Sequence, residues 1–147
     1  MKNMYLILVL LVFSLFIPNA GISGDEIHVQ VLAKDTVSWN GAKLPQYKKG
    51  KPEITILKIV IPPKTKLPWH KHPVINAGVL LKGNLTVITK ENKVLHLKEG
   101  DPIVEVVNKW HFGENTSNEP AVIIMFYAGT KGVPITVVDH SKEKIAK

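Results

Sequence analysis

The stretch from His70 to Gly83, HKHPVINAGVLLKG, is the part of the sequence that decides the fold. His70 and His72 stand two residues apart, so on a β-strand both imidazoles project from one face while Lys71 projects from the other. Residues 82–84, KGN, predict a tight turn after the stretch, since Gly and Asn tolerate positive φ. The stretch therefore predicts a strand that carries two potential metal ligands and leads into a hairpin.

A second segment, residues 100–115 (GDPIVEVVNKWHFGEN), supplies a third histidine, His111. Two imidazoles on one strand and a third on another can converge on a single ion inside a small barrel. The other histidines lie apart from this pattern and are expected at the surface or at strand edges: His28, His96 and His140.

Glu105 is the remaining candidate acid–base group, because it stands in the otherwise apolar run 103–107, IVEVV. If its side chain faces a cavity, the carboxylate can act as a general base or replace a metal ligand. If it faces outward, it is an ordinary solvated side chain. The aromatic residues Phe112, Phe126 and Tyr127 are expected in the core, with a pocket wall as the alternative.

Short β-branched runs separated by turn residues fill the chain from residue 26 onward. These runs predict strands near 28–33, 53–61, 66–72, 75–82, 84–90, 93–98, 101–107, 110–115 and 119–128, with mostly loop over 34–52. Many short strands at even spacing indicate an antiparallel barrel of the jelly-roll kind. Since 147 residues are one domain's worth, we predict a single all-β domain built on an antiparallel barrel of six to eight strands.

The first 24 residues are predicted to be a secretory signal peptide. Lys2 precedes an apolar or small run over residues 4–17, and no further charge occurs before Asp25. The run is shorter than the roughly 20 residues needed to cross a bilayer, so a retained membrane anchor is the less favoured alternative. Both alternatives place residues 25–147 outside the cytoplasm, in the periplasm or the extracellular space, and only a retained segment gives membrane contact.

The composition limits the chemistry that the domain can perform. The chain has no cysteine, which excludes disulfides and thiolate ligands and leaves nitrogen and oxygen donors for any metal. The formal net charge is +7, and every one of the 19 basic residues is a lysine. Without arginine there is no bidentate fork for phosphate or guanine, so nucleic acid is not an expected partner.

The two histidine segments resemble the two signature motifs of the cupin superfamily. In the first motif, His70, His72 and Gly83 stand at the family's spacing, whereas Asn76 replaces the usual glutamate and Lys64 replaces the opening glycine. The resemblance therefore includes both histidines of the motif but lacks its carboxylate.

In the second motif, Gly100, His111 and Asn115 match, whereas Val106 replaces a proline and Asn108 replaces the inner glycine. Asparagine is the next most tolerant residue for a left-handed turn, so the exchange at 108 is mild. The resemblance implies a single cupin β-barrel whose family-like core covers about residues 55–130.

The resemblance further implies that His70, His72 and His111 bind one divalent transition metal as neutral imidazoles. Asn76 would ligate the ion through its amide oxygen or orient a bound water. Iron, manganese, nickel, copper and zinc all accept imidazole, so the sequence does not name the metal. The alternative is a barrel that has kept the fold and lost the metal together with the glutamate.

From these residues we expect an exported metal-dependent enzyme of the oxygenase type acting on a small molecule. Three neutral ligands leave the double charge of the ion uncompensated, which favours an anionic substrate. Asn76 and Glu105 are the candidate catalytic residues. Two alternatives are a non-catalytic ligand- or metal-binding module outside the cytoplasm and a structural partner in a membrane-associated assembly.

Residues 121–127, AVIIMFY, are apolar at both even and odd positions. A strand with two apolar faces must be covered on both sides, whereas a small barrel covers only the inner one. The outer face is therefore predicted to be covered by the N-terminal segment or by a second subunit, and we favour a homodimer.

Overall fold

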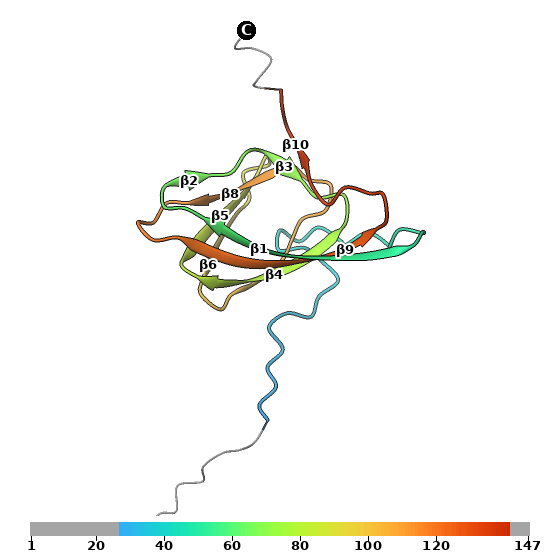
Figure 1. Cartoon of the computed structure of the whole chain (residues 1–147), viewed down its shortest axis with the longest axis horizontal. Helices are drawn as coiled ribbons and strands as arrows, with labels where there is room; N and C mark the ends of the chain where they lie inside the picture. The colour runs from blue at the N-terminus through green and yellow to red at the C-terminus, as the bar shows by residue number, and fades with distance from the viewer. Residues whose placement is uncertain (1–26, 142–147) are drawn as a thin grey trace, which may run out of the picture. The chain divides into compact units, whose positions relative to one another are not determined.

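The computed structural model describes residues 27–141, and residues 31–141 form the β domain shown in Figure 1. The predicted signal peptide, residues 1–24, lies outside the described residues. Within residues 27–141 we find no helix with the length and apolar character required to span a membrane.

The described part of the chain contains ten strands. They are β1 (Pro52–Ile61), β2 (Thr65–Lys66), β3 (His70–Lys71), β4 (Ile75–Lys82), β5 (Asn84–Thr89), β6 (Val94–Lys98), β7 (Pro102–Val104), β8 (His111–Asn115), β9 (Ala121–Thr130) and β10 (Val137–Val138). They form one sheet in the order β1-β9-β4-β7 and a second in the order β10-β3-β8-β5-β6, with β2 beside β8. Every named pair is antiparallel, which confirms the predicted all-β jelly roll.

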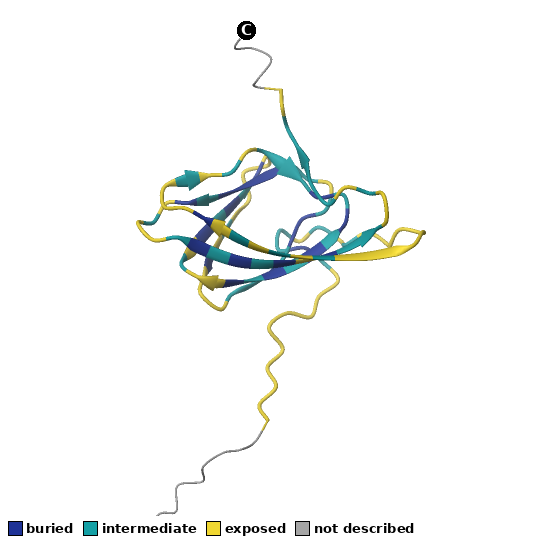
Figure 2. Cartoon of the chain, in the orientation of Figure 1, coloured by how far each residue is buried: buried dark blue, intermediate teal, exposed yellow. Residues whose placement is uncertain are grey.

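Alternation along the long strands builds the core between the two sheets. On β9, Ile123 and Met125 are buried, whereas the intervening Ile124 is only half-buried and Phe126 is exposed (Figure 2). The core consists of inward side chains from both sheets: Ile61, Val74, Leu80, Leu85, Val87, Leu97, Ile103, Ala121, Ile123, Met125 and Tyr127. Period-two alternation along these strands therefore separates the core face from the outer face.

Two predicted turn positions have left-handed backbone. Gly83, between β4 and β5, has φ of 80°, and a side chain there would collide with the backbone of Pro120. Asn108 has φ of 57°, so asparagine does adopt the conformation for which the family usually has glycine.

The strand prediction was wrong in four places, and one of them is the run 101–107, where β7 covers only Pro102–Val104. Residues 66–72 do not form one strand but two short ones, β2 and β3, because Pro68 between them has no N–H to donate to a ladder. Residues 28–33 form no strand. The two-residue strand β10, which pairs with β3, was not predicted. The described residues contain ten strands, more than the six to eight expected for the barrel.

The outer face of the sheet β1-β9-β4-β7 is almost entirely apolar. Ile56 on β1 is 58% exposed and lies opposite Phe126 on β9, which is 48% exposed. Further exposed apolar side chains on this face are Ile54, Val60 and Leu81. We call these five residues the outer patch. The one charged side chain among the outward positions of β1 between residues 54 and 60 is Lys58.

The loop over residues 31–50 packs against the other margin of the same sheet, beside β7. Trp39 donates its backbone N–H to the carbonyl of Val104 at 2.9 Å. A single β-bridge between Val37 and Lys43 closes the loop on itself. This contact brings Trp39, which is far away in sequence, next to the segment that follows β7.

Candidate metal centre

Three histidines meet at one end of the space between the sheets. His70 lies on β3 and pairs directly with His111 on β8, while His72 follows β3 and forms a bridge to Val107. One donor nitrogen from each ring lies within 4.8 Å of the others. His72 and His111 are buried, at 5% and 2% exposure. The structure therefore brings together the three residues that the sequence predicted as ligands.

Backbone carbonyls fix which nitrogen of each ring is available. The Nδ1 atoms of His70, His72 and His111 lie 2.8, 2.8 and 2.9 Å from the carbonyl oxygens of Pro68, Ile135 and Lys109. A carbonyl oxygen only accepts hydrogen bonds, so each Nδ1 carries a hydrogen, and in the neutral ring each Nε2 presents a lone pair. This is how protein metal sites orient imidazole ligands, and the donor set fits a divalent transition metal.

Burial keeps two of the rings neutral. Desolvation lowers the pKa of His72 to about 3, although its hydrogen bond to Ile135 acts in the opposite direction. Desolvation also lowers the pKa of His70. After desolvation, the next cause that lowers the pKa at both sites is the neighbouring His111, because like charges in close rings repel. Neutral imidazole is the form that binds a metal, so the environment favours the ligating state.

Glu105 lies inside the fold beside the histidines, although sequence alone left an outward position open. It is 5% exposed, and its Oε2 lies 3.7 Å from Nε2 of His111. Its other oxygen, Oε1, accepts hydrogen bonds from the indole Nε1 of Trp39 at 2.9 Å and from the backbone N–H of Val106 at 2.8 Å. These two hydrogen bonds hold the carboxylate with its Oε2 directed toward His111.

The two motif asparagines have different surroundings. Asn76 is 1% exposed, donates its Nδ2 to the carbonyl of Val74 at 3.1 Å, and has no hydrogen-bond partner for its Oδ1. Asn76 is not among the residues that line the cavity, and its predicted role as a ligand stays a prediction. Asn115 is a turn residue, whose side-chain Nδ2 donates to the carbonyls of Ile61, Pro62 and Glu119.

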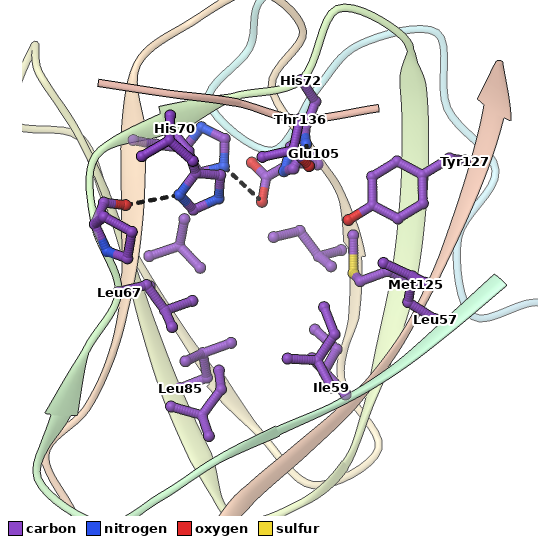
Figure 3. A pocket seen from close by; sticks show the side chains of 18 residues that line it. Leu57, Ile59, Leu67, His70, His72, Leu85, Glu105, Met125, Tyr127 and Thr136 are labelled. Atoms are coloured by element: carbon purple, nitrogen blue, oxygen red, sulfur yellow. Dashed lines mark hydrogen bonds and ion pairs between the residues drawn. The ribbon is translucent and has the colours of Figure 1, made fainter. Parts of the chain in front are cut away.

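A cavity of about 220 Å³ extends from the histidines into the fold (Figure 3). Its far end is lined by hydrocarbon side chains, including Leu57, Ile59, Leu67 and Leu85. Figure 3 shows the polar groups together at the opposite end, with the carboxylate of Glu105 directed at the histidines. The site thus combines a polar end that can hold a metal with an apolar end that can hold a hydrocarbon group.

Tyr127 contributes a hydroxyl group to the cavity wall. Burial raises the pKa of its phenol to about 12, and the negative charge of Glu105 adds to the effect. The hydroxyl therefore stays protonated at neutral pH and can donate a hydrogen bond. Of the other aromatic candidates, Phe112 is buried without lining the cavity and Phe126 lies on the outer patch.

Sequence reasoning missed Trp39 and Thr136. Trp39 holds Glu105, and the Thr136 hydroxyl lies 3.2 Å from Nδ1 of His72. No local pattern marks either residue, since each approaches the site from a loop far away in the chain. The histidines outside the motifs, His28, His96 and His140, are exposed as predicted.

The comparisons with known proteins agree with this site and fold. The cupin domain family matches residues 57–127. Residues 57–127 are therefore a cupin domain, and the two-sheet jelly roll agrees with that family. Among curated proteins, none matches this sequence.

Three solved structures illustrate the likeness. The DMSP lyase DddQ from Ruegeria pomeroyi DSS-3 is 17% identical, with a TM-score of 0.52 over 59% of this chain and 43% of that chain. An uncharacterized conserved protein with a double-stranded beta-helix domain from Klebsiella pneumoniae subsp. pneumoniae MGH 78578 is 17% identical, with a TM-score of 0.50 over 64% and 84%. A cupin-like protein from Thermotoga maritima MSB8 is 15% identical, with a TM-score of 0.49 over 62% and 69%. The chain spans less than half of the lyase. At 17% identity, the likeness to the lyase and to the Klebsiella protein shows the fold alone.

Proposed function

We propose that this protein is a metal-dependent enzyme of the oxygenase type that acts on a small molecule. The observation that supports this function is the convergence of three Nε2 lone pairs, from His70, His72 and His111, at the end of a cavity. A divalent ion held there would act as a Lewis acid and offer open positions for substrate and oxygen.

The residues of the chain itself define what the substrate must look like. The cavity wall away from the histidines is hydrocarbon, so the substrate should join a chelating polar group to a short apolar body. We propose that the polar group is anionic, because the chain supplies neutral imidazoles. The protonated Tyr127 hydroxyl can hydrogen-bond to that group, and the Glu105 carboxylate can accept a proton from it.

Asn76 is proposed to assist the centre by holding a water. Its Oδ1 is buried and lacks a hydrogen-bond partner among residues 27–141. A buried oxygen of this kind usually accepts a hydrogen bond from an ordered water. Asn76→Glu should tighten metal binding if this oxygen touches the ion.

The metal content of variants tests the proposed function. Protein purified from its own compartment, without chelators or metal-affinity columns, should contain about one equivalent of a divalent transition metal by elemental analysis. His70→Ala and His111→Ala should lose that metal, because each removes one of the three donors. His96→Ala is the matched control, since His96 is an exposed histidine on β6. Wild-type metal content in both site variants would contradict the proposal.

A non-catalytic module that binds a ligand or a metal is the second candidate. The observation that favours it is the absence of the motif glutamate, since Asn76 occupies that position. Oxygen uptake and product formation should be measured across a panel of small acids and phenols, with and without a chelator. Turnover that disappears with the chelator supports the enzyme, whereas binding without turnover supports the module.

We further propose that the domain is exported and forms a homodimer. Export rests on the signal-peptide pattern of residues 1–24. The dimer rests on the outer patch, because an apolar sheet face that ends in the long edge strand β1 exposes both side chains and unpaired backbone groups. A second copy offers a patch of the same composition, so a two-fold arrangement covers both at once.

A further inference from the structure

The carboxylate of Glu105 faces Nε2 of His111, and a cation at this nitrogen, either a proton or a metal ion, makes the arrangement favourable. Nδ1 of His111 donates to the carbonyl of Lys109, so in the neutral ring that binds a metal Nε2 carries the lone pair. That Nε2 lies 3.7 Å from Oε2 of Glu105, which is too far for a hydrogen bond. Two acceptors that face each other in a buried site repel unless a positive charge lies between them.

The separation of these two atoms is that of neighbouring ligands on one ion. Transition-metal ions bind imidazole nitrogen and carboxylate oxygen at about 2.1 Å, which places two donors in a tetrahedral arrangement about 3.4 Å apart. The observed 3.7 Å between Oε2 of Glu105 and Nε2 of His111 is close to this value. The group of donor atoms within 4.8 Å of one another holds the three histidines without Glu105, so a shared ion would draw Oε2 toward the other two rings. Oε1 of Glu105 is already occupied by Trp39 and Val106, so Oε2 is the oxygen left to bind.

The position of Glu105 relates directly to the residue that the first motif lacks. Glu105 follows β7, the strand that pairs with β4, and its backbone N–H donates to the carbonyl of Asn76 at 3.0 Å. The side chain of Asn76, at the motif position, is turned back onto the carbonyl of Val74. The carboxylate and the amide thus come from neighbouring positions on two adjacent chain segments.

We propose that Glu105 is the fourth protein ligand of the metal and supplies from the adjacent segment the carboxylate that is absent at Asn76. This inference rests on the proposed function, since it requires that the three histidines bind a metal. Trp39 is then a positioning residue, because its indole N–H fixes Oε1 and leaves Oε2 free. The hydroxyl of Ser38 donates to the carbonyl of Glu105 at 2.9 Å and steadies the same segment.

A carboxylate ligand also narrows the substrate class. Three imidazoles and one carboxylate leave a divalent ion with one net positive charge rather than two. A buried site is most stable when its charges balance, so a chelating group with a single negative charge is the best match. The apolar far end of the cavity then receives the uncharged remainder of the substrate.

Metal binding by Glu105→Gln tests this inference without any activity assay. The amide keeps an oxygen that can accept from Trp39 and Val106, so the fold should persist by circular dichroism. Competition with a chelator should show that Co²⁺ binds the variant about 10- to 100-fold more weakly than the wild type. The visible absorption spectrum of bound Co²⁺ should shift as well, because an oxygen ligand with negative charge has been replaced. Glu99→Gln removes an exposed carboxylate and should change neither property.

Trp39→Phe gives a second measurement that keeps the side chain at position 105. It removes the indole N–H and should weaken Co²⁺ binding several-fold while Glu105 remains in place. Wild-type affinity and spectrum in both Glu105→Gln and Trp39→Phe would overturn the inference. If His70→Ala still abolishes binding in that case, the proposed metal function stands and only the role of Glu105 fails. If the wild-type protein binds no Co²⁺ at all, the metal function itself fails.

Discussion

The two faces of the sheet β1-β9-β4-β7 carry similar apolar side chains, but one face is buried in the core and the other is exposed. On the inner face, Leu80 is 0% exposed and Ile123 is 4% exposed. On the outer face, Ile56 and Phe126 are 58% and 48% exposed. Both faces are rich in aliphatic side chains, so hydrophobicity alone does not define the core of this molecule. The second sheet and the cavity enclose one face, and residues 31–141 leave most of the other open.

Adjacent leucines on β4 provide the strongest test of this difference. Leu80 points into the core, whereas Leu81 is 48% exposed on the outer patch. Leu80→Ala should lower the free energy of unfolding by about 2–5 kcal/mol, because it removes buried apolar volume. Leu81→Ala should change it by less than about 0.5 kcal/mol. Urea denaturation of both variants measures the difference.

The leucine comparison should be made at protein concentrations low enough to prevent self-association. Equal losses of stability in the two variants under those conditions would contradict the assignment of inner and outer faces. A larger effect of Leu81→Ala only at high concentration would instead show that a second copy covers the patch.

The long strands could be predicted from sequence because alternation and turn residues agree. β4 and β5 are separated by Gly83 in a left-handed turn, and both strands lie within a residue of the predicted bounds. The break at Pro68 was missed although a proline inside a strand pattern is a signal for one, because the alternation of His70 and His72 favoured one continuous strand. β10 has two residues, which is too short for any periodicity to register.

The three histidines could be predicted as a cluster because the spacing of His70 and His72 fixes their common face and the resemblance to the cupin motifs adds His111. The orientation of Glu105 could not be predicted, because β7 ends at Val104 and the alternation stops there. Glu105 and Val106 are consecutive and both buried, so parity gives no answer. The partner that fixes Glu105, Trp39, lies 66 residues away in sequence, and only tertiary structure brings it near.

The free energy of unfolding of the metal-free protein should fall with decreasing pH before the carboxyl groups titrate, because of the buried histidines on the inner face. The unfolded chain binds protons at the ordinary histidine pKa of about 6.5, whereas burial lowers the pKa of His72 to about 3 and lowers that of His70. The stability contribution of these neutral rings is complete above pH 6.5 and is lost as the pH falls from there toward 3. The slope should approach about 1.4 kcal/mol per pH unit for each histidine.

Urea denaturation in the presence of a chelator, between pH 7.5 and 5, measures this slope. His72→Gln should reduce it, because a group that titrates only in the unfolded state has been removed. His96→Gln should leave it unchanged, since His96 is exposed in the folded protein. A flat dependence on pH in the wild-type protein would contradict the account of buried neutral imidazoles.

The smallest effect on stability, and the sharpest test of the outer face, is expected from Ile56→Lys. Ile56 is exposed and pairs across the sheet with Phe126, so a lysine there should change the stability of one chain by less than about 0.5 kcal/mol. If the outer patch is a dimer interface, the same change should convert the dimer to a monomer, because it places a charge in an apolar contact. Sedimentation velocity measures the mass directly.

Val94→Lys is the matched control for the dimer, since Val94 is 49% exposed on β6 of the other sheet. It adds the same charge at a similarly exposed β-branched residue and should leave the dimer intact. A wild-type protein that sediments as a monomer at every concentration would overturn the proposed dimer.

Lys58 limits how two copies can be arranged, since two copies that brought these lysines together would repel each other. The two-fold axis should therefore pass closer to Ile56 and Phe126 than to Lys58, and Lys58→Ala should strengthen the association.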